Sequence, residues 1–138
     1  GQIAGYSVAE PFGSIALEMG YGKVFEDPDH LWHDNICCAL VFNGQFVDEH
    51  HDLAKAFTKA YLDAGTYLDE HPKAQEEISL KYMKFNDPVI ERSLKVIGFK
   101  DLALTEERYN ALVHHMTHID LIKNVPSYSE FVDQTLLP

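Results

Sequence analysis

Three of the eight histidines lie close together, at positions 114, 115 and 118. His114 and His118 are four residues apart and would share one face of a helix, the spacing at which two imidazoles bind one metal ion. The zinc-protease signature also requires a glutamate directly after the first histidine, but His115 stands there and no third ligand is identifiable. We therefore assign these histidines a solvated or helix-capping role and predict neither a metal site nor a cofactor.

The only two cysteines, Cys37 and Cys38, are adjacent, and neighbouring cysteines close a strained ring when they form a disulfide. Both lie in an apolar run, residues 36–42, which is typical of a buried strand. Burial in apolar surroundings keeps a thiol inert, because the reactive form is the charged thiolate. The alternative is a nucleophilic cysteine activated by His33, which is close in sequence. We favour buried, structural cysteines and predict no catalytic residue.

Glu10 stands between a short apolar segment, residues 2–9, and Pro11. Proline disfavours a helical residue before it, so we predict that residues 2–9 form a brief buried strand. Glu10 would then lie at the carboxyl end of a strand, where open α/β sheets bind ligands. The alternative is a carboxylate at a helix entry, close to positively polarised backbone amides.

The elements that would position these residues change in character at about residue 43. The first part is loop-rich, with a predicted helix over residues 11–19 and predicted strands over residues 2–9, 23–25 and 36–42. In the second part, apolar residues recur at helical spacing and predict a long helix that ends near Glu70. Its apolar stripe, which we expect to be packed, consists of Leu53, Phe57, Ala60, Tyr61, Ala64 and Leu68.

Start signals predict four further helices in the second part. Proline fits the first turn of a helix, and Ser, Thr and Asp are preferred caps. The expected helices run over residues 72–84, from Asp87-Pro88, over 105–122 and after Ser127 or Ser129.

A chain of 138 residues has the size of one domain, and the pattern predicts a helix-rich α/β fold with few short strands. Two or three short strands are too few for an independent sheet. A strand that is apolar on both faces, such as residues 36–42, belongs inside a parallel sheet. We infer that the chain is the C-terminal portion of a larger α/β protein, or that it completes its sheet by associating with another copy.

The charge excludes one class of partner. The sequence has 22 acidic and 11 basic residues, a formal net charge of −11, which repels the phosphates of nucleic acids. No stretch approaches the roughly 18 consecutive apolar residues of a membrane span. The phosphate-binding glycine loops and the G-x-S-x-G motif of hydrolases are also absent from the sequence.

Several segments resemble one family in their order and spacing. Ala9-Glu10-Pro11-Phe12 is followed by Gly20-Tyr21-Gly22-Lys23-Val24, and the resemblance continues in Phe46–His50, Leu68–Pro72 and Phe131–Leu137. These segments are similar to the substrate-binding proteins of nitrate/sulfonate/taurine-type ABC importers. These are type II periplasmic binding proteins, a family that includes binders of bicarbonate and of thiamine pyrimidine precursors.

The resemblance implies a two-lobed protein with the solute in the cleft between the lobes. This sequence would match only the C-terminal portion of that fold. Residues 1–42 would end the second lobe and include the crossover strand, and residues 43–138 would form the helical C-terminal part of the first lobe. The implied location is the periplasmic or extracellular face of the cell membrane, with the transporter permease as a partner.

The resemblance also implies which residues approach the solute: Glu10, Trp32, His33, Cys37 and Cys38. The cysteine pair stands where nitrate and bicarbonate binders have charged residues. This difference favours an organic or heteroaromatic solute, stacked on Trp32 or Tyr6, over an inorganic anion.

Three functions remain open at this point. The leading one is solute binding by closure of two lobes, with no bond made or broken. The second is an enzyme on the same scaffold, similar to the thiamine pyrimidine synthases, although the longer cysteine cluster of those enzymes is missing here. The third is a ligand-sensing regulatory domain fused to another protein.

Overall fold

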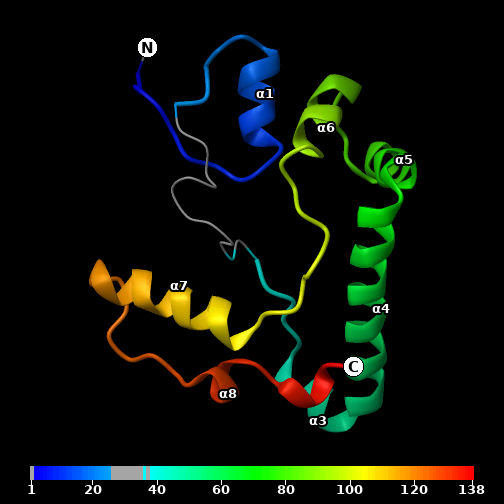
Figure 1. The fold of residues 1–138 in the computed structure, drawn as a ribbon, viewed down its shortest axis with the longest axis vertical. Coiled ribbons are helices and arrows are strands. Elements are labelled where there is room, and N and C mark those ends of the chain that lie inside the picture. Colours follow the sequence, from blue (N-terminus) through cyan, green and yellow to red (C-terminus); the bar gives the residue numbers. More distant parts are fainter. Residues whose placement is uncertain (1, 26–35, 37) are drawn as a thin grey trace. The chain divides into compact units, whose positions relative to one another are not determined.

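The structure, a computed structural model, describes residues 2–25, 36 and 38–138 (Figure 1). All regular elements among these residues are helices. They are α1 (Phe12–Glu18), α3 (Gly44–Glu49), α4 (His51–Glu70), α5 (Pro72–Tyr82), α6 (Asp87–Ser93), α7 (Glu106–His118), α8 (Tyr128–Phe131) and the 3-10 helix η1 (Gln134–Leu136). None of the helices in the described part of the chain has the length and hydrophobicity needed to cross a membrane.

The chain divides into two compact units, and each is built from two separate stretches of sequence. The first unit comprises Gly1–Leu31 and Gly65–Lys100. The second comprises Trp32–Ala64 and Asp101–Pro138. Helix α4 is shared between the units: residues 51–64 belong to the second unit and residues 65–70 to the first.

The core of the first unit lies where α1 packs against α6. Ile90 of α6 is fully buried and Val89 is nearly so. The ring of Phe12, at the start of α1, meets the ring of Phe85 edge to face, with centroids 6.4 Å apart. Burial of Val89 and Ile90 removes apolar surface from water and, together with the ring contact, holds the two short helices together.

The core of the second unit gathers around Tyr109 of α7, which is buried together with Leu136 of η1. The Tyr109 hydroxyl donates a hydrogen bond to the carbonyl of Pro126 at 2.6 Å. The Tyr109 ring stacks on Phe131, with centroids 5.1 Å apart, and also contacts Tyr128. These aromatic contacts fasten the C-terminal segment to α7.

The helix starts predicted at Pro72, Thr105 and Ser127 are confirmed, whereas Asp87, predicted as a cap, is already the first residue of α6 and follows Asn86 at the cap position. Helix α5 begins at Pro72, and Thr105 caps α7 by accepting a hydrogen bond from the backbone N–H of Arg108 at 3.3 Å. Before α8, the backbone N–H and the hydroxyl of Ser127 both donate to the carboxylate of Glu130. Cap chemistry acts over three or four residues, so it can be recognised from the sequence alone.

The three predicted strands are wrong, and the described part of the chain is helical rather than α/β. Residues 2–9, 23–25 and the described part of 36–42 form no ladder of backbone hydrogen bonds. Their side chains are not buried either: Ile3 is 71 % exposed and Val41 is 80 % exposed. The physical reason is that a strand exists only through hydrogen bonds to a neighbouring strand, and no second strand lies among the described residues.

Helix α4 ends at Glu70 as predicted, but its apolar stripe is not packed as expected. Leu53 is 59 % exposed and Phe57 is 54 % exposed, whereas the buried positions are Ala54, Thr58 and Gly65. The buried positions therefore lie on a different face from the predicted apolar stripe. The predicted helix was therefore right, and the face assigned to its packing was wrong.

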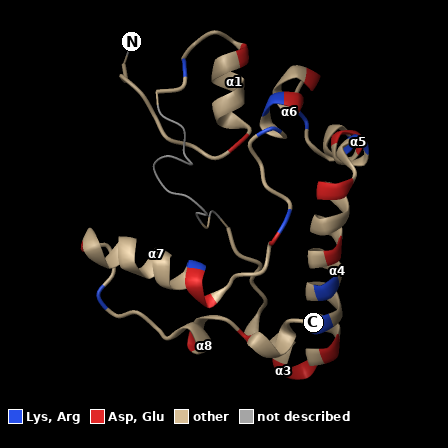
Figure 2. Cartoon of the chain, viewed as in Figure 1, with Lys and Arg blue, Asp and Glu red and all other residues tan. Residues whose placement is uncertain are grey.

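Charged residues are spread over several helices (Figure 2). On α4, Lys59 donates to the carboxylate of Asp63 at 2.6 Å, a surface pair one turn apart. Helix α7 carries Glu106 and Glu107 in its first turn, where the helix dipole favours negative charge. These acidic residues thus support the ends and surfaces of individual helices.

Candidate functional site

Glu10 lies immediately before α1 and contacts α6. Its Oε2 accepts a hydrogen bond from the hydroxyl of Ser93 at 2.9 Å and one from the backbone N–H of Ser14 at 3.3 Å. Both serines are buried, while Glu10 itself is partly exposed. The carboxylate therefore satisfies an amide in the first turn of α1 and ties that turn to α6, which is the geometry of a carboxylate at a helix entry.

Gly13 makes room for this carboxylate. A Cβ atom at position 13 would lie 3.0 Å from Oε1 of Glu10 and 3.8 Å from its Cδ. Real Cβ atoms rarely come so close, so with a larger residue at position 13 the Glu10 carboxylate would have to shift by a few tenths of an ångström. The glycine and the carboxylate form one local arrangement.

A second polar link joins the same two helices. The guanidinium of Arg92, next to Ser93 on α6, pairs with the carboxylate of Glu18 near the end of α1. Both side chains are partly exposed, so solvent weakens this pair. Helix α1 is thus held to α6 at its start by Glu10 and near its end by Glu18.

Tyr6 lies beside the start of α1, in the same unit as Glu10. Its hydroxyl donates to the backbone carbonyl of Phe12 at 3.3 Å, and the side chain is about half exposed. An exposed aromatic ring and a carboxylate are groups that can bind an organic solute by stacking and hydrogen bonding.

The remaining predicted site residues are only partly placed. Trp32, His33 and Cys37 lie outside the described residues. Cys38 is described and is exposed, so its predicted burial is wrong, because the strand that would have buried it does not form. The structure brings Glu10 together with Ser14 and Ser93, and its role in ligand binding remains a prediction.

The histidines of α7 stand on the surface near its C-terminal end. The rings of His114 and His118 are nearly parallel, with centroids 6.3 Å apart, and His115 lies at an angle to His114. In the part of the chain that the structure describes, no three His, Cys, Asp or Glu side chains are placed to hold a metal ion.

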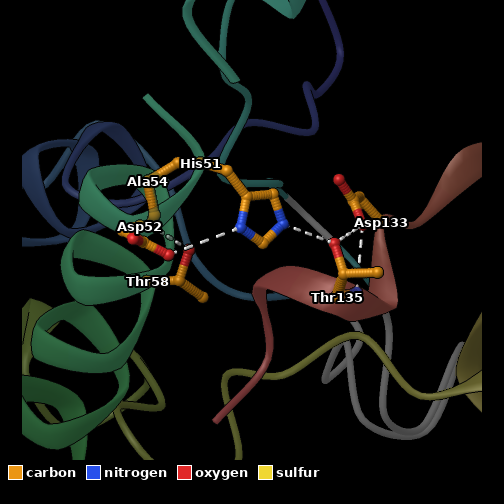
Figure 3. Close-up of polar contacts among 6 residues, drawn as sticks. All are labelled: His51, Asp52, Ala54, Thr58, Asp133 and Thr135. Atoms are coloured by element: carbon orange, nitrogen blue, oxygen red, sulfur yellow. Dashed lines mark hydrogen bonds and ion pairs between the residues drawn. The ribbon is translucent and has the colours of Figure 1, made fainter. Parts of the chain in front are cut away.

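The sequence analysis missed a polar cluster that joins the start of α4 to the C-terminal segment (Figure 3). Nε2 of His51 lies 2.8 Å from the Thr135 hydroxyl, and that hydroxyl donates to Oδ1 of Asp133 at 2.6 Å. On its other side, Nδ1 of His51 lies 4.0 Å from Oδ1 of Asp52. An Asp two residues before a Thr is a recognisable turn signal, but its histidine partner is 84 residues away in sequence from Thr135.

The cluster lowers the pKa of Asp133. The largest cause is the hydrogen bond from the Thr135 hydroxyl, which stabilises the carboxylate. Slight burial opposes this effect, whereas the Thr135 backbone N–H and the positive charge that His51 can carry add to it. The ionised carboxylate of Asp133 therefore orients Thr135, by accepting hydrogen bonds from its hydroxyl and its backbone N–H.

Comparison with known protein families matches residues 1–81 to the NMT1-like family. The matched span includes α1, α3, α4 and most of α5, and it takes up 81 of the 138 residues. The chain belongs to the NMT1-like family, which confirms the family predicted from the motifs within residues 1–81, while the segment Phe131–Leu137 lies outside the match. Neither a curated protein nor a solved structure matches the chain.

Proposed function

We propose that the chain is a solute-binding component of an ABC importer that works by closing two lobes around a small molecule. Membership of the NMT1-like family over residues 1–81 is the observation that carries this proposal. In it, residues 1–42 end the second lobe and residues 43–138 form the helical C-terminal part of the first. The protein acts at the periplasmic or extracellular face of the cell membrane and hands its solute to the permease.

In this proposal the solute is bound on the Glu10 side of the first unit. Both hydrogen bonds that Glu10 makes there are accepted by Oε2, so we assign Oε1 as the acceptor for an N–H group of the solute. The half-exposed ring of Tyr6 offers a stacking surface in the same unit. A carboxylate and an aromatic ring together suit an organic or heteroaromatic solute better than an inorganic anion. Trp32, His33, Cys37 and Cys38 stay predicted solute-binding residues, as the resemblance implies.

The exposed apolar segments near the start of the chain also have a role in this proposal. Residues 2–9 and 38–42 expose apolar side chains and belong to no helix, and segments of this kind can pair with the edge of a sheet. We propose that these segments become strands when they pair with other polypeptide of the two-lobed protein. Pairing with a second copy of the chain is the competing outcome, and it would show as a stable dimer in solution.

The test is a calorimetric titration of the full-length gene product with named solutes. The probes are a hydroxymethylpyrimidine as the thiamine precursor, taurine, nitrate and bicarbonate. We expect the pyrimidine to bind, and we expect Glu10→Gln, which keeps the size of the side chain but loses its charge, to weaken binding by about tenfold or more.

Glu18→Gln is the matched control, because it makes the same chemical change at the other end of α1 and should leave the affinity unchanged. Equal affinity of the Glu10→Gln variant and the unaltered protein would refute the assignment of Glu10. Iron-dependent conversion of the bound pyrimidine would contradict the proposal of solute binding without reaction and would support the enzyme alternative.

A further inference from the structure

The C-terminal segment is fastened to the start of α4 by a short chain of hydrogen bonds within the second unit (Figure 3). His51 is the first residue of α4, and its ring lies between the Thr135 hydroxyl on one side and the Asp52 carboxylate on the other. The backbone N–H of Thr135 also donates to Oδ1 of Asp133, at 3.0 Å. We call His51, Thr135 and Asp133 the C-terminal clasp.

The number of protons in the clasp determines which atoms donate. A threonine hydroxyl has one proton, and at 2.6 Å from Oδ1 of Asp133 that proton is donated to the carboxylate. The Thr135 oxygen must then accept from His51, so His51 carries a proton on Nε2. Both the neutral Nε2–H tautomer and the imidazolium cation satisfy this requirement. Protonation of Nδ1 therefore leaves the clasp intact and adds a positive charge facing Asp52.

We propose that the C-terminal clasp is proton-sensitive: protonation of His51 tightens it and protonation of Asp133 opens it. The positive imidazolium strengthens the hydrogen bond to Thr135 and attracts both carboxylates of the cluster. A protonated Asp133 loses the negative charge that orients the Thr135 hydroxyl. The geometry of the second unit carries this inference, which does not depend on the proposed solute.

The charged groups on the elements next to His51 are mostly acidic. Asp52 lies on the same helix and Asp133 on the C-terminal segment, while α3 carries the exposed Asp48 and Glu49 just before α4. Glu49 is engaged by the side-chain amide of Gln45 at 2.8 Å. The opposing cation on α4 is Lys55, one turn beyond His51 and exposed.

In this proposal the C-terminal clasp holds η1 in its packed position. Leu136 of η1 is buried, and its backbone N–H donates to the carbonyl of Asp133 at 3.3 Å. Opening of the clasp frees Asp133 and Thr135 to move, which exposes Leu136 and its amide to solvent. Protection of that amide against hydrogen exchange therefore reports how often the clasp is open.

The test is native-state hydrogen exchange of the Leu136 and Leu137 amides by NMR. Protection factors, corrected for the intrinsic pH dependence of exchange, are measured across the range in which histidine titrates. We expect protection to fall about two- to fivefold as His51 loses its proton, the size of effect expected for an exposed ion pair. In His51→Gln the side-chain amide supplies a donor that does not titrate, so protection should become independent of pH.

Two further variants make the outcome decisive. His50→Gln makes the same change one residue earlier, outside the clasp, and should keep the pH dependence. Thr135→Val keeps the side-chain shape and removes the hydroxyl, so protection should be low at every pH. Unchanged protection in Thr135→Val, or the same pH dependence in His51→Gln as in the unaltered protein, would overturn the proposal.

Discussion

Replacement of Glu10 by alanine should destabilise the first unit, and the hydrogen bonds indicate by how much. The carboxylate accepts from the Ser93 hydroxyl and from the Ser14 backbone N–H. Ser93 has a second acceptor in the carbonyl of Val89 at 2.8 Å, so its hydroxyl keeps a partner when Glu10 is lost. The amide of the buried Ser14 has no such substitute among its hydrogen bonds in the described residues.

The cost of Glu10→Ala is therefore dominated by one buried amide that loses its acceptor. An unsatisfied buried polar group costs about 1–3 kcal/mol, and loss of a negative charge from a helix start adds about 0.3–1 kcal/mol. We expect the free energy of unfolding to fall by about 1.3–4 kcal/mol. Glu10→Gln retains an acceptor for the amide, so it should cost less than Glu10→Ala.

Urea denaturation followed by circular dichroism measures this effect from the shift in midpoint at constant slope. Glu18→Ala is the matched control, because it removes a carboxylate from the same helix pair but only breaks a partly exposed ion pair, worth about 0–1 kcal/mol. The reasoning fails if Glu10→Ala costs no more than Glu18→Ala, or if Glu10→Gln is as destabilising as Glu10→Ala.

Three other predictions follow from burial and charge. Ile90→Ala removes a fully buried side chain and should cost about 2–5 kcal/mol in urea denaturation; a loss below about 1 kcal/mol would contradict the described core. Hydrogen bonds from Thr135 and Ser127 lower the pKa values of Asp133 and Glu130, so their stabilisation is present above the unfolded pKa of about 4 and is lost as pH falls through the folded values. On going from neutral to acid pH the unaltered protein should therefore lose more stability than Asp133→Asn, which lacks this carboxylate at every pH, and identical pH profiles would refute this linkage. Cys38 is exposed, so in a Cys37→Ser background it should react with a thiol reagent at nearly the rate of the unfolded chain; strong protection in the native state would contradict its placement.

Sequence analysis succeeded where structure is set by neighbouring residues. The starts of α5, α7 and α8 follow from Pro72, Thr105 and Ser127, because a proline or a cap acts within a single turn. Glu10 could be predicted at a helix entry from Pro11 and the helix that follows it. In the structure its carboxylate accepts a hydrogen bond from the backbone N–H of Ser14.

Sequence analysis failed where the outcome depends on a partner distant in sequence or outside the chain. An apolar run such as residues 36–42 shows that a segment can be buried, but a strand also needs a second strand to pair with. Helical spacing identified the apolar stripe of α4, yet Leu53 and Phe57 are exposed while Ala54 is buried. The link from His51 to Thr135 spans 84 residues, and no local pattern announces it.

The most direct test of the proposed function is to recover the solute after binding. The full-length protein is dialysed to equilibrium against a hydroxymethylpyrimidine with and without iron, and the bound fraction is released and analysed by mass spectrometry. We predict saturable uptake of about one molecule per protein and recovery of the compound chemically unchanged under both conditions. No uptake, or recovery of an altered compound, would contradict the account of a binding protein that carries its solute without reacting with it.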